Sequence, residues 1–194
     1  RKLTKARRSA AKTLSQQVQK QLTALGMKAA QLDACLSECP PSLEGLEEVE
    51  FLFTANPGQP LKPLGKVASG GELSRVSLAI QVICARNLTV PSLVFDEVDV
   101  GVGGGVAEIV GRLLRELGQH AQVLCITHQP QVASQGHQHW QVHKIQEDET
   151  THTRIQELDD AARVEELARM LGGVEITEST RNHAKEMLSK AQAA

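Results

Sequence analysis

Apolar side chains repeat at helical spacing near the start of the chain. Residues 3–26 contain no proline, and leucine or valine recurs every three or four positions at Leu14, Val18, Leu22 and Leu25. This spacing gathers the apolar side chains on one face of a helix. The pattern therefore predicts an amphipathic helix, which we interpret as the end of a longer helical arm.

Short apolar runs in the middle of the chain predict strands instead. Residues 93–95 and 123–126 are such runs, and residues 106–117 between them have helical spacing. A strand, a helix and a strand in this order give a right-handed crossover between two parallel neighbours. We therefore expect an α/β fold in which a mainly parallel sheet is flanked by helices.

Turn residues and weaker patterns divide the rest of the chain into smaller elements. In chain order they are a short helical turn ending at Pro40–Pro41, a strand over 49–54, a hairpin of 140–145 and 152–158, a helix ending at Gly172–Gly173, and a last helix from Ser179.

Ser69, Gly70 and Gly71 come just before Glu72 and a stretch with helical spacing, so the glycines mark the start of a helix. The first N–H groups of a helix have no partner within it, and the helix dipole places positive charge there. Glycine also lets an anion approach the backbone closely. This turn is therefore a candidate anion site, although many glycine-rich helix starts are only turns.

Three polar residues follow the two predicted parallel strands. Asp96 and Glu97 come directly after the first strand, and His128 follows the second. The carboxyl ends of parallel strands meet at one edge of the sheet, where open α/β sheets bind ligands. We expect these residues to lie together, whereas alone the acids would indicate a solvated strand end and the histidine a capping or core residue.

The chain has no Gly-x-x-x-x-Gly-Lys-Ser/Thr loop for the phosphates of a nucleotide. The segment from Gly58 to Val67 contains Gly65-Lys66, but its glycines are too far apart, two prolines remove backbone donors, and Val67 has no hydroxyl for Mg²⁺. We interpret it as an extended connector. The other motifs thus form half of a nucleotide site.

Charge is unevenly distributed although the net charge is only −2. All charged residues among the first 32 are basic, and all those from 33 to 61 are acidic. A basic helix at the start could contact a phosphate backbone, but a solvated helix face is the commoner explanation. No apolar run approaches the roughly 20 residues that span a bilayer, so we expect no membrane partner.

The four cysteines form no C-x-x-C pair, which favours reduced, mostly buried thiols over a metal site. The chain also begins inside a helical pattern without a start methionine. We therefore interpret it as a piece of a longer protein.

Several strings in the chain resemble the C-terminal half of an ABC-type ATPase head of the SMC-like class, most closely the RecN-type DNA repair family. They include residues 56–60, 67–75, 79–83, 95–101, 127–133, 136–139 and 166–173. The resemblance covers about residues 49–190. It implies that residues 1–45 are the end of a coiled-coil arm with a connecting helix, and that 46–194 are the C-terminal lobe of the head.

The same resemblance implies roles for the candidate residues. Ser69, Gly70, Gly71 and Glu72 match the signature motif, which contacts the γ-phosphate bound on the opposite head. Asp96 matches the Walker B acid that holds Mg²⁺ through water, and Glu97 the catalytic carboxylate that positions the attacking water. Asp99 matches the D-loop acid of the head interface, and His128 the switch histidine. Arg75 either couples nucleotide state to the arm or forms a helix-surface ion pair.

The function implied is half of an ATP-hydrolysing head in DNA double-strand break repair and recombination, with ATP and Mg²⁺ as cofactors. The expected partners are the N-terminal half of the head with its Walker A loop, a second head in a homodimer, and DNA. The expected place is the bacterial cytoplasm, at the nucleoid. Without a Walker A loop, the chain alone is predicted to be inactive.

Two other functions remain open. The chain could be half of a transporter nucleotide-binding domain, although Glu72 stands where transporters usually have glutamine. It could also be a non-catalytic dimerisation module.

Overall fold

In the computed structural model, the chain forms two compact units, Arg1–Ile126 and Thr127–Ala194. The structure describes residues 1–194 except 57, 67–68, 86–89, 148–149, 174 and 194. Among the described residues, no helix is both long and apolar enough to cross a membrane.

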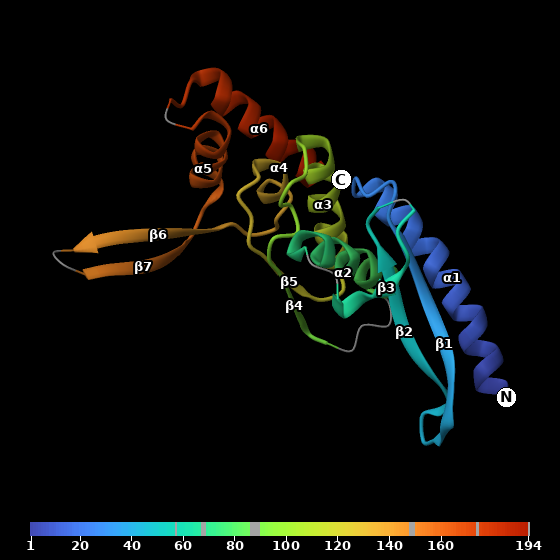
Figure 1. Ribbon diagram of the computed structural model, residues 1–194. Helices are drawn as coiled ribbons and strands as arrows, with labels where there is room; N and C mark the ends of the chain where they lie inside the picture. Colours follow the sequence, from blue (N-terminus) through green and yellow to red (C-terminus); the bar gives the residue numbers. More distant parts are fainter. Residues whose placement is uncertain (57, 67–68, 86–89, 148–149, 174, 194) are drawn as a thin grey trace. The chain divides into compact units, whose positions relative to one another are not determined.

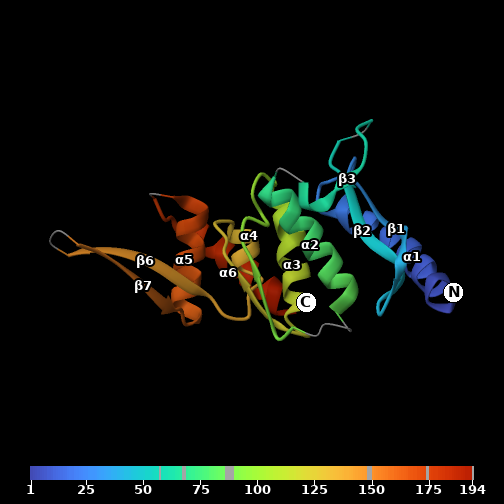
Figure 2. The ribbon, with the colours of Figure 1, turned by 60° about the horizontal axis from the view of Figure 1, so that its bottom comes forward.

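The first unit begins with a helix packed beside an antiparallel sheet. Helix α1 contacts β1 and α2, and Figures 1 and 2 both show it lying along the β1–β2 hairpin. The strand order of the sheet is β1-β2-β3. The bounds are α1 Lys2–Ala24, β1 Gln31–Ser42, β2 Gly45–Thr54, β3 Lys62–Pro63 and the 3-10 helix Leu64–Lys66.

The predicted helical turn before Pro40–Pro41 is wrong, because this segment is the strand β1. Its first four residues alternate in burial, with Leu32 and Ala34 buried and Gln31 and Asp33 exposed. This is the two-residue period of a strand, and a long partner, β2, satisfies the backbone. The prolines lie where the pairing register shifts between Glu38 and Ser42, so they remove few ladder hydrogen bonds.

The rest of the first unit has the predicted strand, helix, strand order. Strands β4 and β5 pair in parallel, with Phe95 opposite Cys125, and form a sheet of two strands, so parallel pairing is less extensive than expected. Helices α2 and α3 contact each other (Figure 2). The bounds are α2 Gly70–Cys84, β4 Ser92–Phe95, α3 Gly104–Leu117 and β5 Gln122–Cys125.

Apolar residues from the helices form the core of the first unit. Helix α3 starts at Gly104, two residues before the predicted start, with Gly103 as its N-cap. The fully buried side chains of the unit include Val18, Leu22, Leu25, Val76, Leu78, Val98, Val110 and Leu117.

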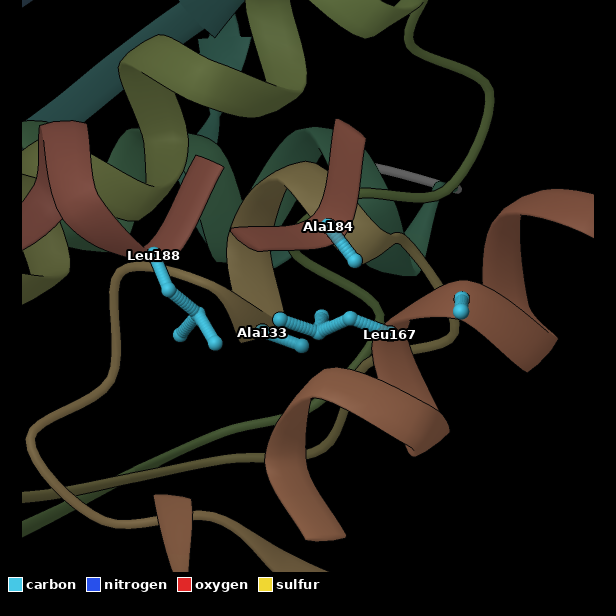
Figure 3. Packing of buried hydrophobic residues seen from close by; sticks show 5 residues of the cluster. Ala133, Leu167, Ala184 and Leu188 are labelled. Carbon is cyan, nitrogen blue, oxygen red and sulfur yellow. The ribbon is translucent and has the colours of Figure 1, made fainter. Parts of the chain in front are cut away.

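The second unit contains the predicted hairpin and the two predicted helices. Ala133, Leu167, Ala168, Ala184 and Leu188 form its buried cluster, which joins α4, α5 and α6 (Figure 3). The β6–β7 hairpin extends away from α5 (Figure 1). The bounds are α4 Pro130–Ala133, β6 Trp140–Glu147, β7 Thr150–Glu157, α5 Asp160–Gly172 and α6 Glu178–Ala193.

Candidate functional site

The glycine turn, Ser69–Glu72, opens helix α2 as predicted. Ser69 is the N-cap residue, and its hydroxyl accepts a hydrogen bond from the Glu72 N–H at 3.4 Å. Its carbonyl accepts the Leu73 N–H at 3.0 Å, which closes the first helical bond. The turn is therefore a well-formed helix start that presents backbone N–H groups.

The end of β4 continues into the Glu97 turn, which we define as Asp96–Gly101. Asp96 and Glu97 are exposed, and the Val100 N–H donates to the Glu97 carbonyl at 3.2 Å. Glu97 has φ +59°, a left-handed conformation that residues with a side chain adopt rarely. Such a conformation persists only where the surroundings hold it, and it recurs at functional sites.

The structure packs these two turns against each other. A Cβ atom on Gly70 would overlap the Glu97 carboxylate oxygen Oε2, and a Cβ on Gly71 would lie 3.2 Å from the Glu97 carbonyl oxygen. The Ser74 hydroxyl donates to the Asp96 carbonyl at 2.8 Å. The glycines therefore allow a close approach of α2 to the acid pair, and Ser69, Gly70, Gly71, Glu72, Asp96 and Glu97 gather in one place.

Asp99 faces the interior of the turn. Its side chain is only 1 % exposed, and its charge and that of Asp96 act on the Cys125 thiol. Burial, followed by these two carboxylates, raises the pKa of Cys125 to about 12. The role of Asp99 at a head interface stays a prediction.

Arg75 was not predicted to contact the Glu97 turn. Its Nη1 donates to the Val100 carbonyl at 2.9 Å, from one helical turn beyond the glycines. From the sequence, Arg75 was expected either to couple nucleotide state to the arm or to form an ion pair on the helix surface. The hydrogen bond to the Val100 carbonyl is neither of these. The sequence signal that could have found it is position, since Ser74 and Arg75 follow the glycine turn on the same helix.

His128 belongs to the second unit. It is exposed, and it lies between Thr127, whose hydroxyl accepts the Gln129 N–H at 2.9 Å, and the start of α4 at Pro130. The chain passes from the first unit to the second between Ile126 and Thr127. The predicted proximity of His128 to Glu97 therefore stays a prediction.

The residues present fit part of a magnesium nucleotide site. Mg²⁺ prefers oxygen ligands and keeps several waters, which suits one exposed carboxylate such as Asp96. In the part of the chain that the structure describes, no three His, Cys, Asp or Glu side chains form a metal-binding group. The segment Gly58–Lys66, predicted to be an extended connector, contains β3 and the 3-10 helix, and Val67 lies outside the described residues.

One face of the β4–β5 sheet is apolar and exposed. Val94 is 66 % exposed, Leu124 48 % and Ile126 61 %. Val94 and Leu124 are cross-strand partners, and the Ile126 N–H continues the ladder to the Phe95 carbonyl. All three side chains therefore point to the side of the sheet opposite buried Phe95.

The chain is similar along its length to bacterial DNA repair proteins. It is 50% identical over 192 residues to the DNA repair protein RecN of Vibrio cholerae and 40% identical over 205 residues to that of Bacillus subtilis. These matches cover 98% and 97% of the chain but only 35% and 36% of the relatives, at their C-terminal end. The chain thus spans about a third of these relatives' length. No protein-family model matches it.

Solved structures with the same fold are SMC head domains. One from Pyrococcus yayanosii, with a coiled coil and joint, has a TM-score of 0.58 at 18% identity and covers 84% of this chain and 29% of that chain. One from Pyrococcus furiosus, bound to the C-terminal domain of ScpA, has a TM-score of 0.55 at 19% identity and covers 84% and 39%. At these identities the likeness concerns the fold.

Proposed function

The chain is homologous to the C-terminal third of RecN proteins and has the fold of SMC heads, and from this premise we propose that it is the signature-bearing half of an ATP-hydrolysing head in DNA double-strand break repair. The observation that carries the proposal is the packing of the glycine turn against the Glu97 turn. Ser74 and Asp96 join them by a 2.8 Å hydrogen bond. This packing supports the proposal because it brings the N-terminal turn of α2 beside the Glu97 carboxylate.

Each turn has its own part in ATP hydrolysis. The exposed Glu97 carboxylate would accept a hydrogen bond from the attacking water and orient it, and Asp96 is the residue that would hold Mg²⁺. Mg²⁺ and ATP, when bound, supply the transferred phosphoryl group and the positive charge that its transition state needs. Ser69, Gly70 and Gly71 present donors to the γ-phosphate held on the opposite head. His128, which matches the switch histidine, senses the γ-phosphate at the site of Asp96 and Glu97.

We assign the exposed face of the β4–β5 sheet to the N-terminal half of the same head. Soluble proteins rarely leave a continuous apolar sheet face uncovered. The described residues also lack the Walker A loop that this half would bring. The active form is then a homodimer of complete heads, and the 194-residue chain alone does not turn ATP over.

DNA is the other partner that we propose. Arg1, the N-cap residue of α1, and Lys5, Arg8 and Lys12 on α1 are exposed and lie about one helical turn apart. They belong to residues 1–45, which were predicted to be the end of a coiled-coil arm with a connecting helix. Arg7 faces inward instead and pairs with Glu47 at 3.4 Å. A stripe of exposed cations suits a phosphate backbone, and such binding weakens steeply with salt. The place of action is the bacterial cytoplasm, at the nucleoid.

The test is ATP turnover by a protein of the relatives' length that carries this chain. Glu97→Gln should lower kcat by about 10²- to 10⁴-fold and leave ATP binding intact, because the amide cannot orient the water as a base. Glu108→Gln, an exposed substitution on α3, is the matched control and should not change kcat. Unchanged turnover in Glu97→Gln would contradict the proposal and favour a non-catalytic dimerisation module.

A further inference from the structure

Two side chains near the start of α2 hold the backbone of the Glu97 turn from both ends. The Ser74 hydroxyl donates to the Asp96 carbonyl at 2.8 Å, just before Glu97. Arg75 Nη1 donates to the Val100 carbonyl at 2.9 Å, where the turn closes. Between them, the Val100 N–H donates to the Glu97 carbonyl at 3.2 Å. The turn therefore depends on α2 for its external hydrogen bonds at Asp96 and Val100.

Arg75 is half-buried. Its Nε is buried and has no hydrogen-bond partner among the residues that the structure describes, and a Cβ on Gly71 would lie 3.5 Å from its Nη1. Burial lowers the pKa of the Arg75 guanidinium, which Glu72 opposes, yet an arginine stays charged at neutral pH. The charged Arg75 guanidinium is thus partly desolvated where it donates to the Val100 carbonyl.

The hydrogen bond from Arg75 to Val100 helps to hold Glu97 in its left-handed backbone conformation. A glutamate at φ +59° is strained and returns to ordinary backbone angles unless neighbouring contacts prevent it. Such a return would turn the carboxylate away from its position beside Gly70. Catalytic geometry tolerates little movement, since a misplacement of about 1 Å can cost about 10²-fold in rate.

We propose that Arg75, assisted by Ser74, is a positioning residue that fixes the Glu97 carboxylate by holding the Val100 end of its turn. The inference rests on the proposed ATPase function. In a dimer of heads, the glycine turn and the Glu97 turn of one head contact two different nucleotides. The bonds from Ser74 and Arg75 then link the two nucleotide sites through each head.

The experiment measures kcat, KM for ATP and the melting temperature in the protein of the relatives' length. Arg75→Met, which keeps the volume and removes the donor, should lower kcat by about 10- to 100-fold and leave KM and the melting temperature nearly unchanged. Arg75→Lys should recover part of the loss, since an ammonium can donate to the same carbonyl. Arg112→Met, at an exposed position of α3, is the matched control.

A second background separates positioning from general structural damage. In Glu97→Gln protein, Arg75→Met should cause no further loss of turnover, because the residue acts through Glu97. Equal losses in both backgrounds, or unchanged kcat in Arg75→Met, would overturn the inference. If Glu97→Gln itself leaves turnover intact, the proposed function fails first, and the inference fails with it.

Discussion

The backbone conformation of Glu97 and the pKa of Cys125 both depend on the residues packed around them. The strained φ of Glu97 and the high pKa of the Cys125 thiol both arise where β4 and β5 end. Side chains of α2 donate hydrogen bonds to the backbone of the turn that contains Glu97. The pKa of Cys125 is raised by burial and by the nearby carboxylates of Asp99 and Asp96. Both properties depend on tertiary packing.

The Cys125 thiol gives a pH prediction. Its pKa is about 12 in the folded chain against an ordinary 9.0, so above about pH 9 the unfolded chain loses the thiol proton while the folded chain keeps it. The folded state then binds more protons, and the free energy of unfolding should fall as pH rises from 9 to 12. Urea unfolding at several pH values measures this slope.

The control for that prediction is a second cysteine. Cys125→Ser should flatten the alkaline fall in stability, whereas Cys84→Ser, at the end of α2, should retain it. An identical slope in Cys125→Ser and the unsubstituted chain would show that another group causes the loss.

Among the helices and strands, most could be predicted from the sequence, but the strand Gln31–Ser42 could not. Helices α1, α2 and α5 follow clear periodicities because each buries one face, and strands β4 and β5 are short apolar runs. The segment Gln31–Ser42 was misjudged because two prolines suggested a stop, while its pairing with β2, which lies later in the chain, decided its structure. Long-range pairing of this kind leaves little local signal.

The N-cap of α5 provides a prediction for one element. The Asp159 carboxylate accepts the Ala162 N–H at 2.8 Å, which satisfies an otherwise free helix donor. Asp159→Ala should lower the free energy of unfolding by about 1 kcal/mol, because the donor loses its partner. Chemical denaturation measures the change.

Asp159→Asn is the matched control, since asparagine caps helices about as well as aspartate. It should retain most of the stability. If the asparagine variant loses as much as the alanine variant, the charge of Asp159 matters more than its hydrogen bond.

For the whole molecule, the sequence indicated candidate site residues but not how the structure holds them. The motifs predicted that the glycine turn and the acid pair belong to one site, and the structure packs these turns together. Contacts from Ser74 and Arg75 could not be foreseen, because side-chain hydrogen bonds to a turn distant in sequence leave no periodic pattern. The same is true of the inward position of Asp99.

The exposed face of the β4–β5 sheet makes a prediction at this scale. The 194-residue chain should self-associate, and the double substitution Val94→Lys with Ile126→Lys should reduce this association by charging the apolar face. Leu43→Lys, at a fully exposed position in the β1–β2 turn, should not. Light scattering over a concentration series distinguishes the variants, and equal association in all of them would place the contact elsewhere.

The central claim is that this chain supplies one half of an ATPase head. The most direct measurement is ATP turnover after mixing the chain with a separately made N-terminal half that carries the Walker A loop. Activity should appear only in the mixture and should be lost in Glu97→Gln and in Ser69→Arg, whose side chain obstructs the glycine turn. No activity from two folded and associated halves, or activity that survives both substitutions, would contradict the claim.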